Sequence, residues 1–176
     1  MSRTITFDVF SPSSIDAAII ELDDYIRHVE YKTDELRERV AYFIAKDASA
    51  VFNTAIAEDD MHEGVITGSV DVTVENQGDN LTLVIANGTD AVFMEFGAGV
   101  YYNGAVGSSP NPWGADLGFT IGSYGKGNGR KEVWAYYDGD GNIHLTHGTP
   151  ASMPLYKAVQ SVSKYIVNIA REVFGN

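Results

Sequence analysis

Two segments near the C-terminal third carry side chains that could bind a metal ion. Asp138-Gly-Asp-Gly-Asn142 has the spacing of the first ligands of an EF-hand calcium loop. That loop needs a bidentate carboxylate at its twelfth position, where this chain has Thr149. His144 and His147 are three residues apart, so they point to opposite faces of a strand, and zinc needs three or four ligands. The pattern favours a hairpin turn, with no metal or cofactor.

A glycine-rich stretch, Gly125-Lys-Gly-Asn-Gly129, could cradle a phosphate. It lacks the Gly-Lys-Ser/Thr ending of a P-loop and the spacing of a dinucleotide fingerprint. With Lys126, Arg130 and Lys131 it is better interpreted as a flexible basic segment that touches a phosphate or an acidic partner. No Gly-x-Ser-x-Gly nucleophile elbow is present, and His62-Glu63 lacks the second histidine of a zinc-protease motif. We therefore expect a protein that is not an enzyme.

The glycines themselves are unevenly distributed. Ten of the 18 lie between Gly97 and Gly129. A loop longer than about 15 residues is uncommon in a domain of this size unless it is functional or disordered, and aromatic side chains argue against plain disorder. We expect residues 97–130 to form an extended arm that becomes ordered against a partner. The candidate partner-contact residues are Phe96, Gly97, Gly99, Tyr101, Tyr102, Trp113, Phe119, Tyr124, Lys126, Arg130 and Lys131.

The chain has a net charge of -12, and residues 1–96 carry 19 acids against 6 bases. Such a surface disfavours binding to nucleic acid or anionic membranes, which depends on cationic contacts. The acids either keep the subunit soluble or repel DNA that passes nearby. For the second alternative the channel-facing candidates are Glu58, Asp59, Asp60 and Glu63, together with Asp71 and Glu75.

Length and composition predict one globular domain over residues 1–176. The chain has no cysteine, which excludes disulfides and thiolate metal sites. The first residues, Met1–Asp8, lack the basic and apolar regions of a signal peptide, and no run of about 18 apolar residues could span a membrane.

Apolar periodicity places the elements. Helical spacing predicts one helix from about Ile15 to Val29, a second from an N-cap at Thr33 to about Ala57, and a third over 155–173. Alternation predicts strands over 65–75, 81–85, 91–96, 133–137 and 142–146, with turns at 76–80 and at Asn87-Gly88. We expect an α+β fold, with two N-terminal helices and a C-terminal helix on one face of an antiparallel sheet and a long Gly-rich loop. Phe43 and Val162 are expected in the core, and Gly97 and Gly99 at positive φ or a close approach.

From about Ile15 onward the order of these elements resembles the neck and tail-completion proteins of tailed bacteriophages, and more distantly the minor tail protein Z group. The resemblance rests on Met94-Glu-Phe-Gly-Ala-Gly99 after the meander, on the aromatic segment from Trp134 to His144, and on Thr149-Pro-Ala-Ser-Met-Pro154 before the last helix. Many relatives carry a Pro-Val-Asp-Thr-Gly-Arg-Leu-like step before the first strand, and Thr67-Gly68 is its closest echo here.

The resemblance implies a virion structural protein made in the host bacterial cytoplasm. Its copies would form a six-fold or twelve-fold homo-oligomeric ring in the neck, between the head-closure or adaptor proteins and the tail terminator or tail tube proteins. Genomic DNA would pass through the ring without being specifically bound, and no membrane would be involved. The alternative is another phage structural binding module, associated with the capsid or the tail tube.

Overall fold

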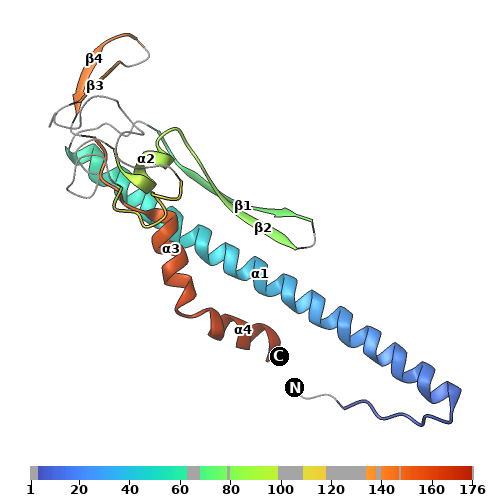
Figure 1. The fold of residues 1–176 in the computed structure, drawn as a ribbon. Helices are drawn as coiled ribbons and strands as arrows, with labels where there is room; N and C mark the ends of the chain where they lie inside the picture. The colour runs from blue at the N-terminus through green and yellow to red at the C-terminus, as the bar shows by residue number, and fades with distance from the viewer. Residues whose placement is uncertain are drawn as a thin grey trace.

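The computed structural model describes residues 4–62, 68–78, 80–98, 109–117, 134–137, 140–146 and 148–175. The order is α1 (Pro12–His62), β1 (Asp71–Gln77), β2 (Leu81–Asn87), α2 (Ala91–Phe96), β3 (Trp134–Tyr137), β4 (Ile143–Thr146), α3 (Pro154–Ser163) and α4 (Ile166–Phe174). The α+β class is therefore confirmed. The β1–β2 hairpin lies along one side of α1, and α3 and α4 lie along another (Figure 1).

Helix α1 is a single helix of 51 residues, and the predicted break at Thr33 is wrong. The Thr33 hydroxyl donates to the carbonyl of Val29 at 2.8 Å, which is a bond inside a helix and not an N-cap. Ion pairs one turn apart stabilise the helix through this region. They join Lys32 to Glu35 at 3.0 Å, Arg37 to Asp34 at 3.1 Å and Arg39 to Glu35 at 2.8 Å. The hydrogen bond from Lys32, with the nearby Arg39 charge, lowers the pKa of Glu35 below its ordinary value.

The segment 91–96, predicted as a strand, is the short helix α2. Its buried residues Ala91, Met94 and Glu95 recur at helical spacing, and the helix ends at Gly97, whose N–H donates to the carbonyl of Phe93 at 2.7 Å. A short apolar run is ambiguous between strand and buried helix, and here the helical alternative holds. Asn87-Gly88 consequently leads from β2 into α2 and does not connect two strands.

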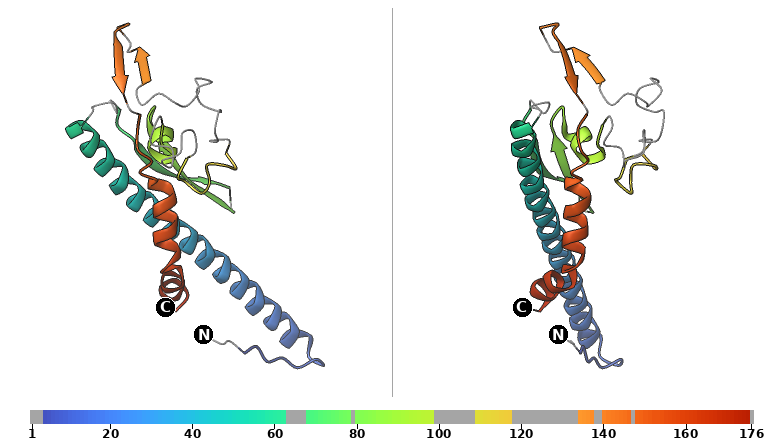
Figure 2. Two further views of the ribbon diagram at one scale, coloured as in Figure 1. Left: turned by 60° about the vertical axis from the view of Figure 1, so that its left-hand side comes forward. Right: turned by 90° about the vertical axis from the view of Figure 1, so that its left-hand side faces the viewer.

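The predicted single sheet is instead two separate hairpins. Strands β1 and β2 pair antiparallel from Asp71 opposite Asn87 to Gln77 opposite Leu81, as expected for a turn at 76–80. Strands β3 and β4 pair from Trp134 opposite Thr146 to Tyr137 opposite Ile143, which confirms a hairpin around Asp138–Asn142. The β3–β4 hairpin projects from the end of the molecule near the C-terminus of α1 (Figures 1 and 2).

The predicted C-terminal helix over 155–173 is interrupted at Lys164 and Tyr165. Their N–H groups donate to the carbonyls of Ser161 and Val162, three residues back, so the last turn tightens before α4 begins in a new direction. The change of direction lets Ile169 and Val173 pack against α1, and the Tyr165 ring meets Phe43 edge-on at 6.2 Å. Within the described ranges, α3 and α4 pack mainly on α1, and α3 also contributes Ala158 to the core beside the β1–β2 hairpin.

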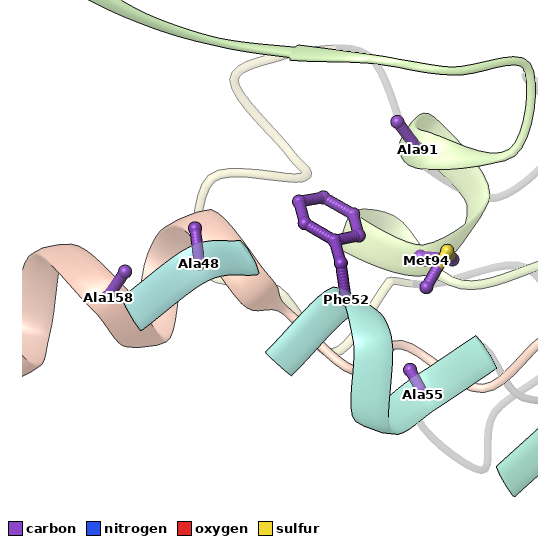
Figure 3. Packing of buried hydrophobic residues seen from close by; sticks show 6 residues of the cluster. All are labelled: Ala48, Phe52, Ala55, Ala91, Met94 and Ala158. Carbon is purple, nitrogen blue, oxygen red and sulfur yellow. The ribbon is translucent and has the colours of Figure 1, made fainter. Parts of the chain in front are cut away.

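The core lies where α1, α2, α3 and the β1–β2 hairpin meet (Figure 3). Its buried members are Ala48, Phe52, Ala55, Ala91, Met94 and Ala158. Small residues on α1 and α3 allow the two helices to approach closely, and Phe52 fills the space between them and α2. Val162 is buried as expected, whereas Phe43 is only half-buried.

We predict that Phe52→Ala lowers the free energy of unfolding by about 3–5 kcal/mol, because a fully buried ring leaves a cavity. Phe43→Ala should cost about 1–2 kcal/mol, less than the full-core value expected from sequence, because part of that ring is already in water. Urea titrations of the two variants test the ranking. If the two variants lost the same free energy of unfolding, the core would not be centred on Phe52.

Candidate partner-interaction site

A buried carboxylate joins α2 to the start of α3. Glu95 is 4% exposed, and its Oε2 accepts a hydrogen bond from the Leu155 N–H at 2.7 Å while its Oε1 accepts one from the Tyr156 N–H at 3.0 Å. These are first-turn N–H groups of α3, which have no acceptor within their own helix. Met153, at the N-cap position, makes no side-chain capping bond. Glu95 therefore supplies from another helix the cap that a local Ser or Asp would ordinarily provide.

The same carboxylate holds the segment 109–117. The side chain of Asn111 is buried, and its Nδ2 donates to Glu95 Oε1 at 2.7 Å and to the Glu95 carbonyl at 3.2 Å. Its Oδ1 accepts a hydrogen bond from the Trp113 N–H at 2.9 Å. The Ser109 hydroxyl donates to the Phe96 carbonyl at 2.6 Å. We call this meeting of α2, the start of α3 and the segment 109–117 around Glu95 the junction. The chain leaves the junction at Ala98 and returns to it at Ser109.

Trp113 lies over the first turn of α3. Its ring meets that of Tyr156 edge-on, with centroids 4.9 Å apart and planes at 82°. Gly114 follows, and a Cβ there would lie 2.8 Å from the Ser109 Cβ, so the turn closes tightly on itself. This part of the predicted arm is therefore packed against the subunit's own α2 and α3.

A third connection joins Gly97 to the segment before α3. The Ala98 N–H donates to the Thr149 carbonyl at 2.8 Å, and the Ser152 N–H donates to the Met94 carbonyl at 2.8 Å. Gly97 has φ 78° and ψ 168°, which confirms the expected positive φ. A Cβ there would lie 3.1 Å from the Ala151 Cβ. Met153 also adopts a left-handed conformation, at φ 53°, which marks strain at the entry to α3.

The structure distributes the predicted contact residues as follows. Phe96 is buried inside the subunit, Gly97 is buried at the junction and Trp113 is half-buried on Tyr156. Among the channel-facing candidates, Glu58 is exposed near the C-terminal end of α1, and Asp59 and Asp60 belong to the last turns of that helix. Asp71 and Glu75 are exposed on β1. The remaining predicted residues lie outside the described ranges: Gly99, Tyr101, Tyr102, Phe119, Tyr124, Lys126, Arg130, Lys131 and Glu63.

Sequence reasoning missed Glu95, Asn111 and Ser109 as the residues that build the junction. One signal was available, because Glu95 is a charged residue inside an otherwise apolar run. A charge in such a run must be paired or hydrogen-bonded if the run is buried. Nothing in the sequence indicated that its donors would come from residues 111, 155 and 156.

The β3–β4 hairpin presents an apolar face to solvent. Ala135, Tyr137, Ile143 and Leu145 share this face, because the register pairs Ala135 with Leu145 and Tyr137 with Ile143. Tyr137 is 71% exposed and Leu145 is 73% exposed. A two-stranded hairpin is marginally stable alone, so an exposed apolar face on one is typical of a contact surface.

Comparison with protein-family models, with curated proteins and with solved structures finds no match to this chain. Within the described ranges, no three histidine, aspartate or glutamate side chains are grouped as metal ligands; His147 lies outside these ranges. None of the helices that the structure describes is long and apolar enough to cross a membrane.

Proposed function

We propose that this chain is a virion structural protein of a tailed bacteriophage. Its copies form a ring in the neck, between the head connector and the tail, through which the genome passes. The role is one of assembly and not of catalysis.

The observation that carries the proposal is apolar surface at two distant places on one subunit. One is the face of the β3–β4 hairpin defined above, and the other is the N-terminal half of α1, where Ile19, Leu22 and Ile26 are exposed. Contiguous apolar surface of this kind is typical of subunits that assemble. A subunit with apolar surface at separate places can contact several partners at once, as a copy in a neck ring contacts its neighbours in the ring and the virion proteins on either side of it.

The junction gives a second, independent support. Two of the three segments that carry the resemblance to neck proteins, Met94–Ala98 and Thr149–Met153, are hydrogen-bonded to each other through their backbones. Residues that are distant in sequence but characteristic of one family pattern thus form a single structural unit. Such a unit would hold the variable Gly-rich insertion at a defined place on the subunit.

Native mass spectrometry, together with averaged electron-microscope images of the purified chain, tests the proposal. We expect rings of six or twelve copies. A monomer or a trimer would instead favour a module associated with the capsid or the tail tube.

A further expectation concerns DNA. If the acidic residues border the DNA path, their repulsion acts over about 8–10 Å at physiological salt. We predict that the isolated protein does not retard duplex DNA in a gel at about 0.15 M salt. Tight, salt-sensitive binding would contradict this and would indicate that Lys126, Arg130 and Lys131 grip DNA.

A further inference from the structure

The N-terminal half of α1 extends beyond the hairpins and the C-terminal helices, and residues 4–11 turn back beside its start (Figures 1 and 2). Its apolar residues recur every three or four positions, and Ile19 is 51% exposed while Leu22 and Ile26 are exposed to a similar degree. Farther along the helix, apolar residues are covered by α3, α4 and the β1–β2 hairpin. The helix carries apolar residues at helical spacing along its length, and Ala18 is the one buried residue among residues 12–36.

Helix α4 has a second apolar face. Ile169 and Val173 are buried, whereas Val167 and Phe174 on the other side are 58% and 41% exposed. Arg171 lies between these two at helical spacing and is also exposed. The outer face of α4 is thus apolar with a cation at its centre.

The N-terminal half of α1 and the C-terminal segment 154–174 carry opposite charges, and Arg171 is the base that lies on the outer face of α4. Residues 12–31 of α1 carry five acids against one base. Three of these acids, Asp16, Asp23 and Glu30, are seven residues apart and exposed. Over residues 154–174 the exposed bases Lys157, Lys164 and Arg171 stand against one acid, Glu172. None of these three acids and three bases has an ion-pair partner within the described part of the subunit.

The chain's own α4 cannot cover the bare half of α1. Tyr165 meets Phe43 at 6.2 Å and Glu172 lies 3.8 Å from Arg39, so α4 is fixed beside residues 39–43. Ile19 is about 30 Å farther along a helix that rises about 1.5 Å per residue. Residues 4–11 of the chain lie beside the start of α1 and still leave Ile19, Leu22 and Ile26 about half exposed, so the occupant that we consider for this face is a second molecule.

We propose that the outer face of α4 in one copy packs on the N-terminal half of α1 in the next copy. The residues in contact are Val167, Arg171 and Phe174 on one side and Ile19, Asp23 and Ile26 on the other. The contact is heterologous, because it joins two different surfaces. It rests on the ring proposed above, since a repeated heterologous contact forms a ring when its rotation closes and an open filament when it does not.

Cysteine crosslinking tests the contact, because the chain has no cysteine of its own. We expect the double variant Ile19→Cys with Val167→Cys to form a ladder of covalent oligomers under mild oxidation. Each single variant should remain uncrosslinked. In the matched control, Lys46→Cys with Val167→Cys, the cysteine on α1 stands at an exposed position of the covered half, and we expect no ladder.

Charge reversal gives a second measurement. Asp23→Lys in the crosslinking variant should slow ladder formation roughly two- to fivefold, and adding Arg171→Glu should restore it. Dimers from Ile19→Cys alone would overturn the proposal, because α1 would then pair with α1. Absence of a ladder from the double variant would also overturn it. If electron-microscope images show a ring but the double variant forms no ladder, the α1–α4 contact is wrong and the neck proposal stands. If the double variant forms a ladder but no rings are seen, the contact stands and the ring is contradicted.

Discussion

Glu95→Ala is expected to lower the free energy of unfolding by about 3–5 kcal/mol. The substitution leaves the N–H groups of Leu155 and Tyr156 without their acceptor, and the Asn111 amide keeps only its longer bond to the Glu95 carbonyl. Few single changes in this chain would disconnect three segments at once. Thermal and urea unfolding of the variant give the measurement.

Two further variants make the result specific. Glu95→Gln keeps the size of the side chain but can accept with only one of its two terminal atoms, so its loss should be intermediate. Glu58→Ala removes an exposed acid from α1 and should change stability by no more than about 0.5 kcal/mol. If Glu95→Ala unfolds at the same temperature as the parent chain, the junction does not hold α2 to α3.

The second large effect is expected at Gly97. With φ 78° and ψ 168°, this residue occupies a region that is essentially restricted to glycine, at a cost of about 1–3 kcal/mol for other residues. A side chain there would also press on Ala151. We predict that Gly97→Val destabilises the protein by roughly 3 kcal/mol or more, because strain and overpacking add.

Gly78→Val is the matched control for Gly97→Val. Gly78 also has a positive φ, of 68°, but nothing lies within 4 Å of its missing Cβ. Its substitution should therefore carry the conformational cost alone, on the order of 1–2 kcal/mol. Equal losses at the two positions would mean that the approach to Ala151 contributes nothing.

Sequence patterns correctly predicted those parts of the fold that depend on interactions between residues close together in the chain. Alternation located the β1–β2 and β3–β4 hairpins, since side-chain spacing and turn residues specify both. The glycine after α2 was correctly expected at positive φ. Each of these features depends on residues close together in the chain.

The secondary-structure predictions were wrong where contacts between residues distant in sequence determine the local conformation. Thr33 is a good N-cap residue, yet α1 continues through it, because neighbouring ion pairs and packing favour the helix. The apolar run 91–96 would fit a strand, but Glu95 must meet donors from α3 and Asn111. The last helix bends at Lys164 so that Ile169 and Val173 reach α1. None of these partners could be identified from local spacing.

The candidate site likewise has one part that could be predicted from the sequence and one part that could not. Sequence pointed to the segment around Gly97 and to Trp113, which the structure brings to one junction. The residues that connect them, Glu95, Asn111 and Ser109, make bonds across sequence separations of 13 to 61 residues. Such separations leave no periodic signal in the sequence.

Head–tail joining is the central claim, and electron microscopy of particles assembled with and without this chain tests it most directly. Without the chain, we predict filled heads and separate tails, and joined particles when the chain is supplied again. In the joined particles the protein should form a ring at the neck. Complete, joined particles in the absence of the chain would contradict the proposal.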